Sequence, residues 1–303
     1  MDLTLTLVAP QSQQILDADA IAQISTALTD AEVYVRSNTE LVPNLAHRIT
    51  LSATDQTDVS NNVRKLIGSR PIDFAVLPER DQKARLLIAD MDSTIIQCEC
   101  LDELADLAGF GPQVSAITER AMRGELDFEG ALRERVKMLE GLPEDTLEQT
   151  YRERIKSMPG AKVLVHTMRQ NGAVTALVSG GFTYFTSRVA DDVGFEMNFG
   201  NTLEIANGKL TGNVADPILG REAKLATLER LCTEHHIDFQ DVIAVGDGAN
   251  DLAMLQRAGT GVSFRGKPIV EEGADVAVKT TDLTTLLYLQ GYSAADIVNP
   301  ANQ

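Results

Sequence analysis

Five short, almost wholly apolar runs recur between residues 86 and 278, and segments of helical or turn-forming composition separate them. The runs are residues 86–89, 174–178, 242–245, 260–262 and 276–278. Such runs are typical of strands that are buried on both faces of a parallel sheet. Strands that alternate with helices build layered α/β domains, so the sequence predicts an α/β fold with a Rossmann-like parallel sheet.

The connection between the first two strands is too long for an ordinary crossover. More than eighty residues separate them, and segments 101–107, 114–123, 128–139 and 147–155 have helical patterns. A βαβ crossover needs only about 10–12 residues, so we expect a helical insertion. It leaves from the carboxyl end of the first strand, where α/β sheets bind ligands, and is placed to act as a cap. Farther on, Asn207-Gly208 between two alternating segments predicts a hairpin over residues 202–214.

The first eighty residues form a second pattern. Strand-like runs and amphipathic helical runs follow one another in the order βαββαβ, which predicts an α+β ferredoxin-like domain. The strands are expected at 3–8, 31–36, 47–53 and 72–77, and the helices at 17–28 and 58–68. A charged stretch over residues 78–85 has the composition of a linker. We therefore expect domains at 1–80 and 81–303.

Net charge, apolar run lengths and cysteine content argue against several classes of binding partner and of cellular location. The formal net charge is −17, which argues against nucleic acid and anionic membranes as partners. No apolar run approaches the roughly 18 residues of a membrane-spanning helix. The chain starts without a cationic segment and an apolar block, so no secretory signal is expected and a cytoplasmic location is predicted. Three cysteines do not make a disulfide framework, and we expect reduced thiols.

Polar side chains follow three of the predicted core strands. Asp90 and Asp92 follow the first, Ser179 and Gly180 follow the second, and Asp247, Asn250 and Asp251 follow the third. Taken singly, each motif also fits a plain turn or a helix cap. Lys224, taken singly, fits an ordinary solvated helix residue.

Taken together, these motifs point to one site. The carboxyl ends of parallel strands meet at one edge of a sheet, which would place Asp90, Ser179 and Asp247 together. Carboxylates suit a hard cation such as Mg²⁺, whereas a hydroxyl, glycine amides and Lys224 suit phosphate oxygens. This set of groups is the one needed for phosphoryl transfer through an aspartyl-phosphate.

The same residues resemble the four motifs of the haloacid dehalogenase (HAD) superfamily. The matching segments are 90–94 (DMDST), 179–181 (SGG), Lys224 and 246–251 (GDGAND). The similarity is greater still to the phosphoserine phosphatases of that superfamily, which share the Asp-x-Asp-Ser-Thr form, a glutamate at the place of Glu99 and a helical cap. Segments 121–128 and 132–136 also resemble their cap. The resemblance covers about residues 86–290 and implies a HAD-type core at about 81–96 and 160–295, with the cap at about 97–159.

The resemblance implies a role for each residue in the core. Asp90 would be the nucleophile, and Asp92 would protonate the leaving oxygen and then deprotonate the attacking water. Mg²⁺ would be held by the carboxylates of Asp90 and Asp247 and by the backbone carbonyl of Asp92. The phosphate-binding and supporting groups would be Ser179, the Gly180 amide, Lys224, Asn250 and Asp251.

The resemblance also implies a substrate with an amino-acid end. Arg135 would bind its carboxylate, because guanidinium pairs with carboxylate through two hydrogen bonds. Glu99 would bind its ammonium group, and Met122 and Phe128 would exclude water when the cap closes. The implied reaction is Mg²⁺-dependent hydrolysis of the small molecule O-phospho-L-serine, the last step of serine biosynthesis.

Alternatives remain open at this point. The substrate could be another small phosphomonoester. A receiver-like signalling module is also phosphorylated on aspartate, but it has no large insertion after the acceptor strand and no acid at the position of Asp92. An inactive scaffold would be expected to have lost a motif residue. The N-terminal domain resembles ACT-like extensions, yet its first turn, 9–13 (APQSQ), lacks glycine, so amino-acid binding, homodimer formation and simple packing are all open.

Overall fold

The computed structural model describes residues 1–80, 82–122 and 125–300. Contacts divide the chain into two compact units. The first comprises Met1–Leu87, Pro159–Val174 and Ile237–Gln303, and the second comprises Ile88–Met158 and Thr175–His236. No helix in the described ranges is long and apolar enough to cross a membrane.

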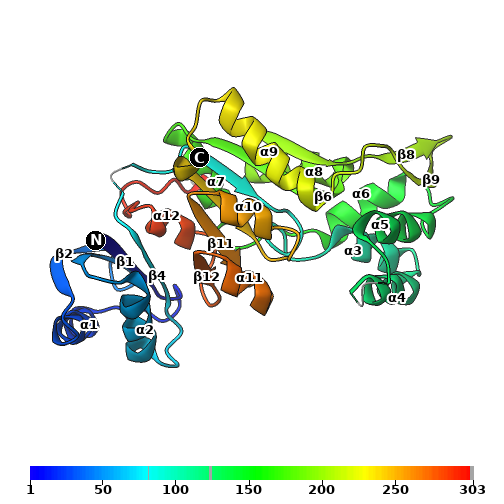
Figure 1. Cartoon of the computed structure of the whole chain (residues 1–303). Coiled ribbons are helices and arrows are strands. Elements are labelled where there is room, and N and C mark those ends of the chain that lie inside the picture. Colours follow the sequence, from blue (N-terminus) through cyan, green and yellow to red (C-terminus); the bar gives the residue numbers. More distant parts are fainter. Residues whose placement is uncertain (81, 123–124, 301–303) are drawn as a thin grey trace. The chain divides into compact units, whose positions relative to one another are not determined.

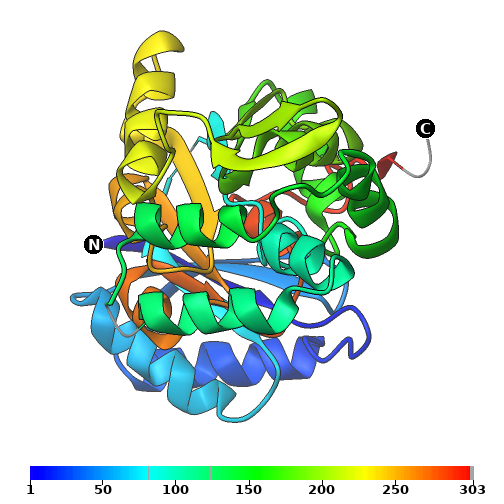
Figure 2. The ribbon, with the colours of Figure 1, turned by 90° about the vertical axis from the view of Figure 1, so that its right-hand side faces the viewer.

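The N-terminal residues confirm the βαββαβ order. The elements are β1 (Asp2–Val8), α1 (Ala18–Asp30), β2 (Tyr34–Val42), β3 (Ala46–Ser52), α2 (Gln56–Ile67) and β4 (Asp73–Pro78). Their strands form a sheet in the order β2-β3-β1-β4, and β1 is antiparallel to both of its neighbours. Both helices lie side by side on one face of this sheet (Figures 1 and 2). Alternate residues Leu3, Leu5 and Leu7 fill the core beneath them, as strand periodicity requires.

Hydrogen bonds set the beginnings of both N-terminal helices. The side chain of Asp17 accepts from the backbone N–H of Ala20, and that of Asp55 accepts from the N–H groups of Thr57 and Asp58. These bonds satisfy donors that have no partner inside the helix. Strand β2 starts later and runs farther than residues 31–36, because residues 31–33 still belong to the turn after α1.

A six-stranded sheet has the order β12-β11-β10-β5-β6-β7. Its strands are β5 (Leu86–Ala89), β6 (Val174–Phe182), β7 (Met197–Asn201), β10 (Val242–Gly246), β11 (Thr260–Phe264) and β12 (Val276–Val278). The pairs β10–β11, β11–β12 and β6–β7 are parallel, which confirms the α/β prediction. Strand β7 was not predicted from the sequence, because its residues MNFGN lack an apolar run and, apart from the last, are only partly buried.

Helices follow the core strands in alternation. They are α7 (Ala161–Gln170), α8 (Thr183–Val193), α9 (Arg221–Glu234), α10 (Leu252–Arg257), α11 (Pro268–Gly273) and α12 (Thr285–Leu289), with a 3₁₀ turn at Phe239–Asp241. The candidate site residues lie where core strands end and the next helices begin.

The predicted insertion is helical. It consists of α3 (Cys100–Leu107), α4 (Gly111–Met122), α5 (Phe128–Lys137) and α6 (Asp145–Arg154), and Figure 1 shows these helices gathered in one group. The hairpin β8 (Leu203–Ala206) and β9 (Lys209–Val214) packs on α5. Its turn contains Asn207 and Gly208, both with positive φ, as a primed two-residue turn requires.

Within the first unit, one buried carboxylate joins the N-terminal sheet to the segment after β12. Asp73, 5% exposed, accepts hydrogen bonds from the backbone N–H groups of Lys279, Thr280 and Thr281. The hydroxyl of Thr281 also donates to it at 2.7 Å. The domain boundary near residue 80 stays a prediction, since both of these parts belong to the first compact unit.

Candidate active site

Asp90 and Lys224 form a buried ion pair in the second unit. Asp90 follows β5 directly, and Lys224 lies in the first turn and a half of α9. The ammonium nitrogen of Lys224 lies 2.6 Å from Oδ1 of Asp90, and the two side chains are 1% and 8% exposed. Burial of two charges is tolerated only when they are paired at close range. The pair therefore fixes the Asp90 carboxylate in one orientation, and Lys224 is no solvated helix residue.

Asp92 lies beside this pair with both of its carboxyl oxygens engaged. Oδ1 accepts from the backbone N–H of Cys100 at 2.9 Å, and Oδ2 accepts from the hydroxyl of Ser179 at 3.0 Å. Burial of the carboxyl group raises the pKa of Asp92, although these two bonds and the charge of Lys224 work in the opposite direction. A carboxyl group with a raised pKa keeps its proton to higher pH, which suits a proton donor near neutrality.

The Ser179 segment brings a hydroxyl and two glycines against Asp92. Ser179 is 1% exposed, and its hydroxyl oxygen accepts from the N–H of Gly181 at 2.8 Å. A Cβ at Gly181 would lie 3.0 Å from both Oδ2 of Asp92 and Oγ of Ser179. Only glycine allows this approach without displacing one of them. The polar groups of the segment thus converge on the Asp92 side chain.

Phe128 connects the cap helices to this segment. It begins α5, is 38% exposed, and its ring edge lies 3.0 Å from where a Cβ of Gly180 would be. The same ring packs against Gly220, which precedes α9. The ring thus lies over the glycines that lead into the Ser179 and Lys224 segments. The side chain of Met122, the second expected apolar residue, lies outside the described part of the structure.

Arg135 and Glu99 carry opposite charges in the same unit. Arg135 is partly buried, and its Nε donates to the carbonyl of Ala131 at 3.2 Å. Burial lowers the pKa of Arg135, whereas the charges of Asp102, Glu99 and Asp92 raise it, so these carboxylates lie within electrostatic reach. Glu99 is exposed and accepts from the hydroxyl of Ser93 at 2.8 Å. Only Nε of Arg135 takes part in the bond to Ala131, so the terminal N–H groups of the guanidinium can bind a further acceptor.

Three further candidates lie in one loop of the first unit, after β10. Asp251 is fully buried, and its Oδ2 accepts from the N–H of Gly248 at 3.0 Å. Asp251 occupies the N-cap position of α10, but its side chain makes no capping hydrogen bond to that helix, so a simple helix cap does not describe its role. Asp247 is partly buried, and its backbone carbonyl accepts from the N–H of Lys267 at 3.2 Å. Asn250 is partly buried as well. The Asp251 carboxylate thus stiffens the loop that presents Asp247.

Sequence reasoning missed Asn201, which links two segments of the site. Its amide donates to the carbonyls of Gly180 and Leu219 at 2.8 and 3.1 Å, and its carbonyl accepts from the N–H of Leu219 at 2.7 Å. The side chain is 2% exposed. It ties the glycine segment after Ser179 to the turn that leads into α9 and Lys224. A polar residue at the end of a strand was the available signal, but β7 itself was not predicted.

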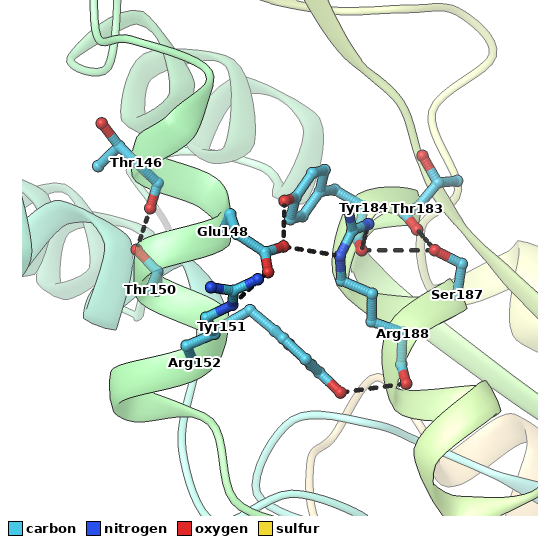
Figure 3. Close-up of polar contacts among 9 residues, drawn as sticks. All are labelled: Thr146, Glu148, Thr150, Tyr151, Arg152, Thr183, Tyr184, Ser187 and Arg188. Carbon is cyan, nitrogen blue, oxygen red and sulfur yellow. Dashed lines mark hydrogen bonds and ion pairs between the residues drawn. The ribbon is translucent and has the colours of Figure 1, made fainter.

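A polar cluster also fastens the last cap helix to the core helix α8. Figure 3 shows Oε2 of Glu148, on α6, accepting from the hydroxyl of Tyr184 at 2.9 Å and from Nε of Arg188 at 3.3 Å. The hydroxyl of Tyr151 donates to the carbonyl of Arg188 at 3.2 Å. Burial, together with the bond to Glu148, raises the pKa of Tyr184 to about 12. These bonds hold α6 in place beside α8.

Comparison with models of protein families shows to which family the chain is related. Residues 87–256 match the model of the haloacid dehalogenase-like hydrolases. The chain belongs to this hydrolase family. The predicted HAD-type fold is thereby confirmed, and the receiver-like alternative does not hold.

Two solved structures and one sequence relative show how far the similarity to other HAD hydrolases extends. The phosphoserine phosphatase of Haemophilus influenzae is 47% identical over 232 residues, covering 77% of this chain and 71% of its own. A HAD-family hydrolase of Salmonella enterica superposes with a TM-score of 0.84 at 31% identity, covering 96% of this chain and 98% of that one. A phosphoserine phosphatase solved as a phospho-aspartyl intermediate analogue gives 0.64 at 38% identity, covering 69% and 99%.

Within this HAD chain, the donor set suits a metal ion. Carboxylate ligands are available from Asp90, Asp247 and Asp251. Oxygen donors of this kind are preferred by hard divalent cations. The acidic residues are therefore compatible with the metal-dependent chemistry of HAD phosphatases.

Proposed function

We propose that the chain hydrolyses O-phospho-L-serine to L-serine and phosphate. The observation that carries the proposal is the buried Asp90–Lys224 pair beside Asp92, whose pKa is raised. This arrangement offers a fixed carboxylate nucleophile and a separate proton donor. The relatives named as phosphoserine phosphatases support the choice of substrate.

The first half-reaction is a transfer to Asp90. A carboxylate oxygen of Asp90 forms a bond to phosphorus while the bond from phosphorus to the serine oxygen breaks. Asp92 gives its proton to that oxygen, so serine leaves as the neutral alcohol. In the second half-reaction Asp92 takes a proton from water, the water oxygen attacks phosphorus, and the bond to Asp90 breaks.

Phosphate oxygens need donors in both steps. Lys224, the Ser179 hydroxyl and the Gly180 amide would supply them, and Asn250 would supply another. Asp247 would hold Mg²⁺ together with the Asp90 carboxylate and the Asp92 carbonyl. Neighbouring strands β10 and β5 support this arrangement, because their carboxyl ends precede these aspartates. Bound Mg²⁺ would neutralise charge on the phosphoryl group.

The amino-acid end of the substrate would contact the cap. Arg135 would bind the carboxylate with its remaining guanidinium donors, and Glu99 would bind the ammonium group. Phe128, with Met122, would exclude water from the phosphoryl group. The proposed enzyme is cytoplasmic, its residues 1–80 form an ACT-like domain, and its proposed assembly is a homodimer.

The test is phosphate release from a panel of phosphomonoesters. Phosphoserine, phosphoethanolamine and phosphoglycolate are compared with and without Mg²⁺, and chelation of divalent cations should abolish turnover. Asp90→Asn should abolish it too, because the amide is a poor nucleophile, whereas Asp238→Asn, an exposed carboxylate elsewhere, should not. A preference for phosphoglycolate or phosphoethanolamine would favour the alternative of another small phosphomonoester. Normal turnover by Asp90→Asn would refute the mechanism.

A further inference from the structure

A cavity lies in the first unit between the N-terminal sheet and the core segments beside it. Its volume is about 240 Å³. Residues of β1 and β3 form one wall, and residues 240–243, 259–260 and 289–290 form the other. Pockets for drug-sized ligands span roughly 300–1,000 Å³, so this cavity has room for a small metabolite. None of the candidate residues of the active site lines it.

Arg48 lines this cavity without a partner. The residue is partly buried, and in the described part of the chain its guanidinium makes no hydrogen bond or ion pair. Burial lowers the pKa of Arg48, and no nearby carboxylate opposes that effect. A guanidinium that is partly removed from water and has no acceptor is in a less favourable setting than one paired with an anion. The second arginine of the cavity differs, because Arg80 donates to the carbonyls of Gln240 and Gly259.

A buried hydroxyl without a partner lies on the same face of the sheet as Arg48. Thr4 is 4% exposed, lines the cavity, and its Oγ1 makes no hydrogen bond in the described structure. In the register of β1 and β3, Arg48 lies opposite Thr6, and Thr4 is two residues farther along the same face. Side chains at such positions are within reach of one another. The same face of the sheet therefore brings a guanidinium and an unpartnered hydroxyl to the wall of one cavity.

Carboxylates restrict what the remainder of the cavity accepts. Asp241 and Asp275 line it, and Oδ2 of Asp275 is engaged by the N–H of Gly261 at 2.8 Å. A second anionic group would meet repulsion there. The ligand that fits has one oxyanion end and no other negative charge.

We propose that this cavity binds a small ligand through one carboxylate or phosphate group, held by Arg48 and the Thr4 hydroxyl. Guanidinium binds either oxyanion with two parallel hydrogen bonds. The site is separate from the active site and does not depend on the proposed reaction.

The experiment is isothermal titration calorimetry of the full chain without divalent cations. Inorganic phosphate is the probe in one arm and acetate in the other, which shows which oxyanion the site takes. Arg48→Gln should lose one saturable site, or weaken it by at least about tenfold, since a charge-assisted bond is removed. Arg64→Gln, which removes an exposed arginine of the same domain, should bind like the wild type.

Thr4→Val provides a second readout, because valine keeps the shape of threonine and removes only the hydroxyl. It should weaken the same site severalfold. If Arg48→Gln folds poorly, this variant alone decides the question. Unchanged binding of both probes by the folded variants, or no binding beyond a site that Arg48→Gln retains, would show that the cavity holds only water and overturn the proposal.

Discussion

Substitution of Arg135 should separate the recognition of serine from the recognition of phosphate. Phosphate is common to every phosphomonoester, so Lys224 and Ser179 cannot select the amino-acid end. Arg135 is partly desolvated in the structure and still has unused guanidinium donors. Arg135→Met keeps most of the aliphatic stem and removes those donors.

The expected size of the effect follows from the bonds that are lost. A hydrogen bond to a charged group contributes about 1.5–3 kcal/mol, and about 1.4 kcal/mol corresponds to a factor of ten. Arg135→Met should therefore lower kcat/KM for phosphoserine by about 10- to 150-fold. The loss for phosphoethanolamine, which has no carboxylate, should be much smaller.

A matched control lies two residues away on the same helix. Arg133 is 40% exposed at its side chain and pairs with Glu129 and Asp216. Exposed pairs contribute about 0–1 kcal/mol, so Arg133→Met should change kcat/KM for either substrate by no more than a few fold. The assay measures initial rates of phosphate release by the wild type and both variants. Its substrates are phosphoserine, phosphoethanolamine and phosphoglycolate. An equal loss for phosphoserine and phosphoethanolamine in Arg135→Met would show that Arg135 serves the cap in general and refute the reasoning.

Three further predictions concern contacts that the structure defines. Asn201→Ala should lower kcat/KM for phosphoserine by at least about tenfold, because each unsatisfied buried group that it leaves costs about 1–3 kcal/mol and the two segments it ties would loosen; an unchanged value would exclude this positioning role. In a double-mutant cycle followed by urea unfolding without metal, Lys224→Met alone should cost about 3–5 kcal/mol, and adding Asp90→Asn should recover about 2 kcal/mol or more of the summed losses; strictly additive losses would contradict the buried pair. Titration of tyrosine absorbance at 295 nm should show two groups near pKa 12, Tyr184 and Tyr292, and in Glu148→Gln only the pKa of Tyr184 should move toward the ordinary value of about 10, since the acceptor of its hydroxyl loses its charge; a titration curve identical to wild type would contradict the bond in Figure 3.

The sequence by itself determined the element order and the motif residues. Strands buried on both faces, such as β5 and β10, show as apolar runs because no alternation is needed there. The length of the insertion and the Asn207-Gly208 turn are likewise local signals. Asp90, Asp92 and Ser179 could be found because they follow such runs, where a polar residue is conspicuous.

Only the tertiary structure decided which partners these residues have. The hydrogen bond from the Ser179 hydroxyl to Asp92, and the pairing of Lys224 with Asp90, join segments that lie far apart in the sequence. Strand β7 was not predictable because its half-buried residues carry no periodic signal, and Asn201 was missed with it. The lack of a partner for Arg48 could not be predicted either, because a position in one strand does not reveal whether an opposite charge lies near it in the fold. Local patterns report how a segment folds, whereas burial and pairing depend on contacts between distant segments.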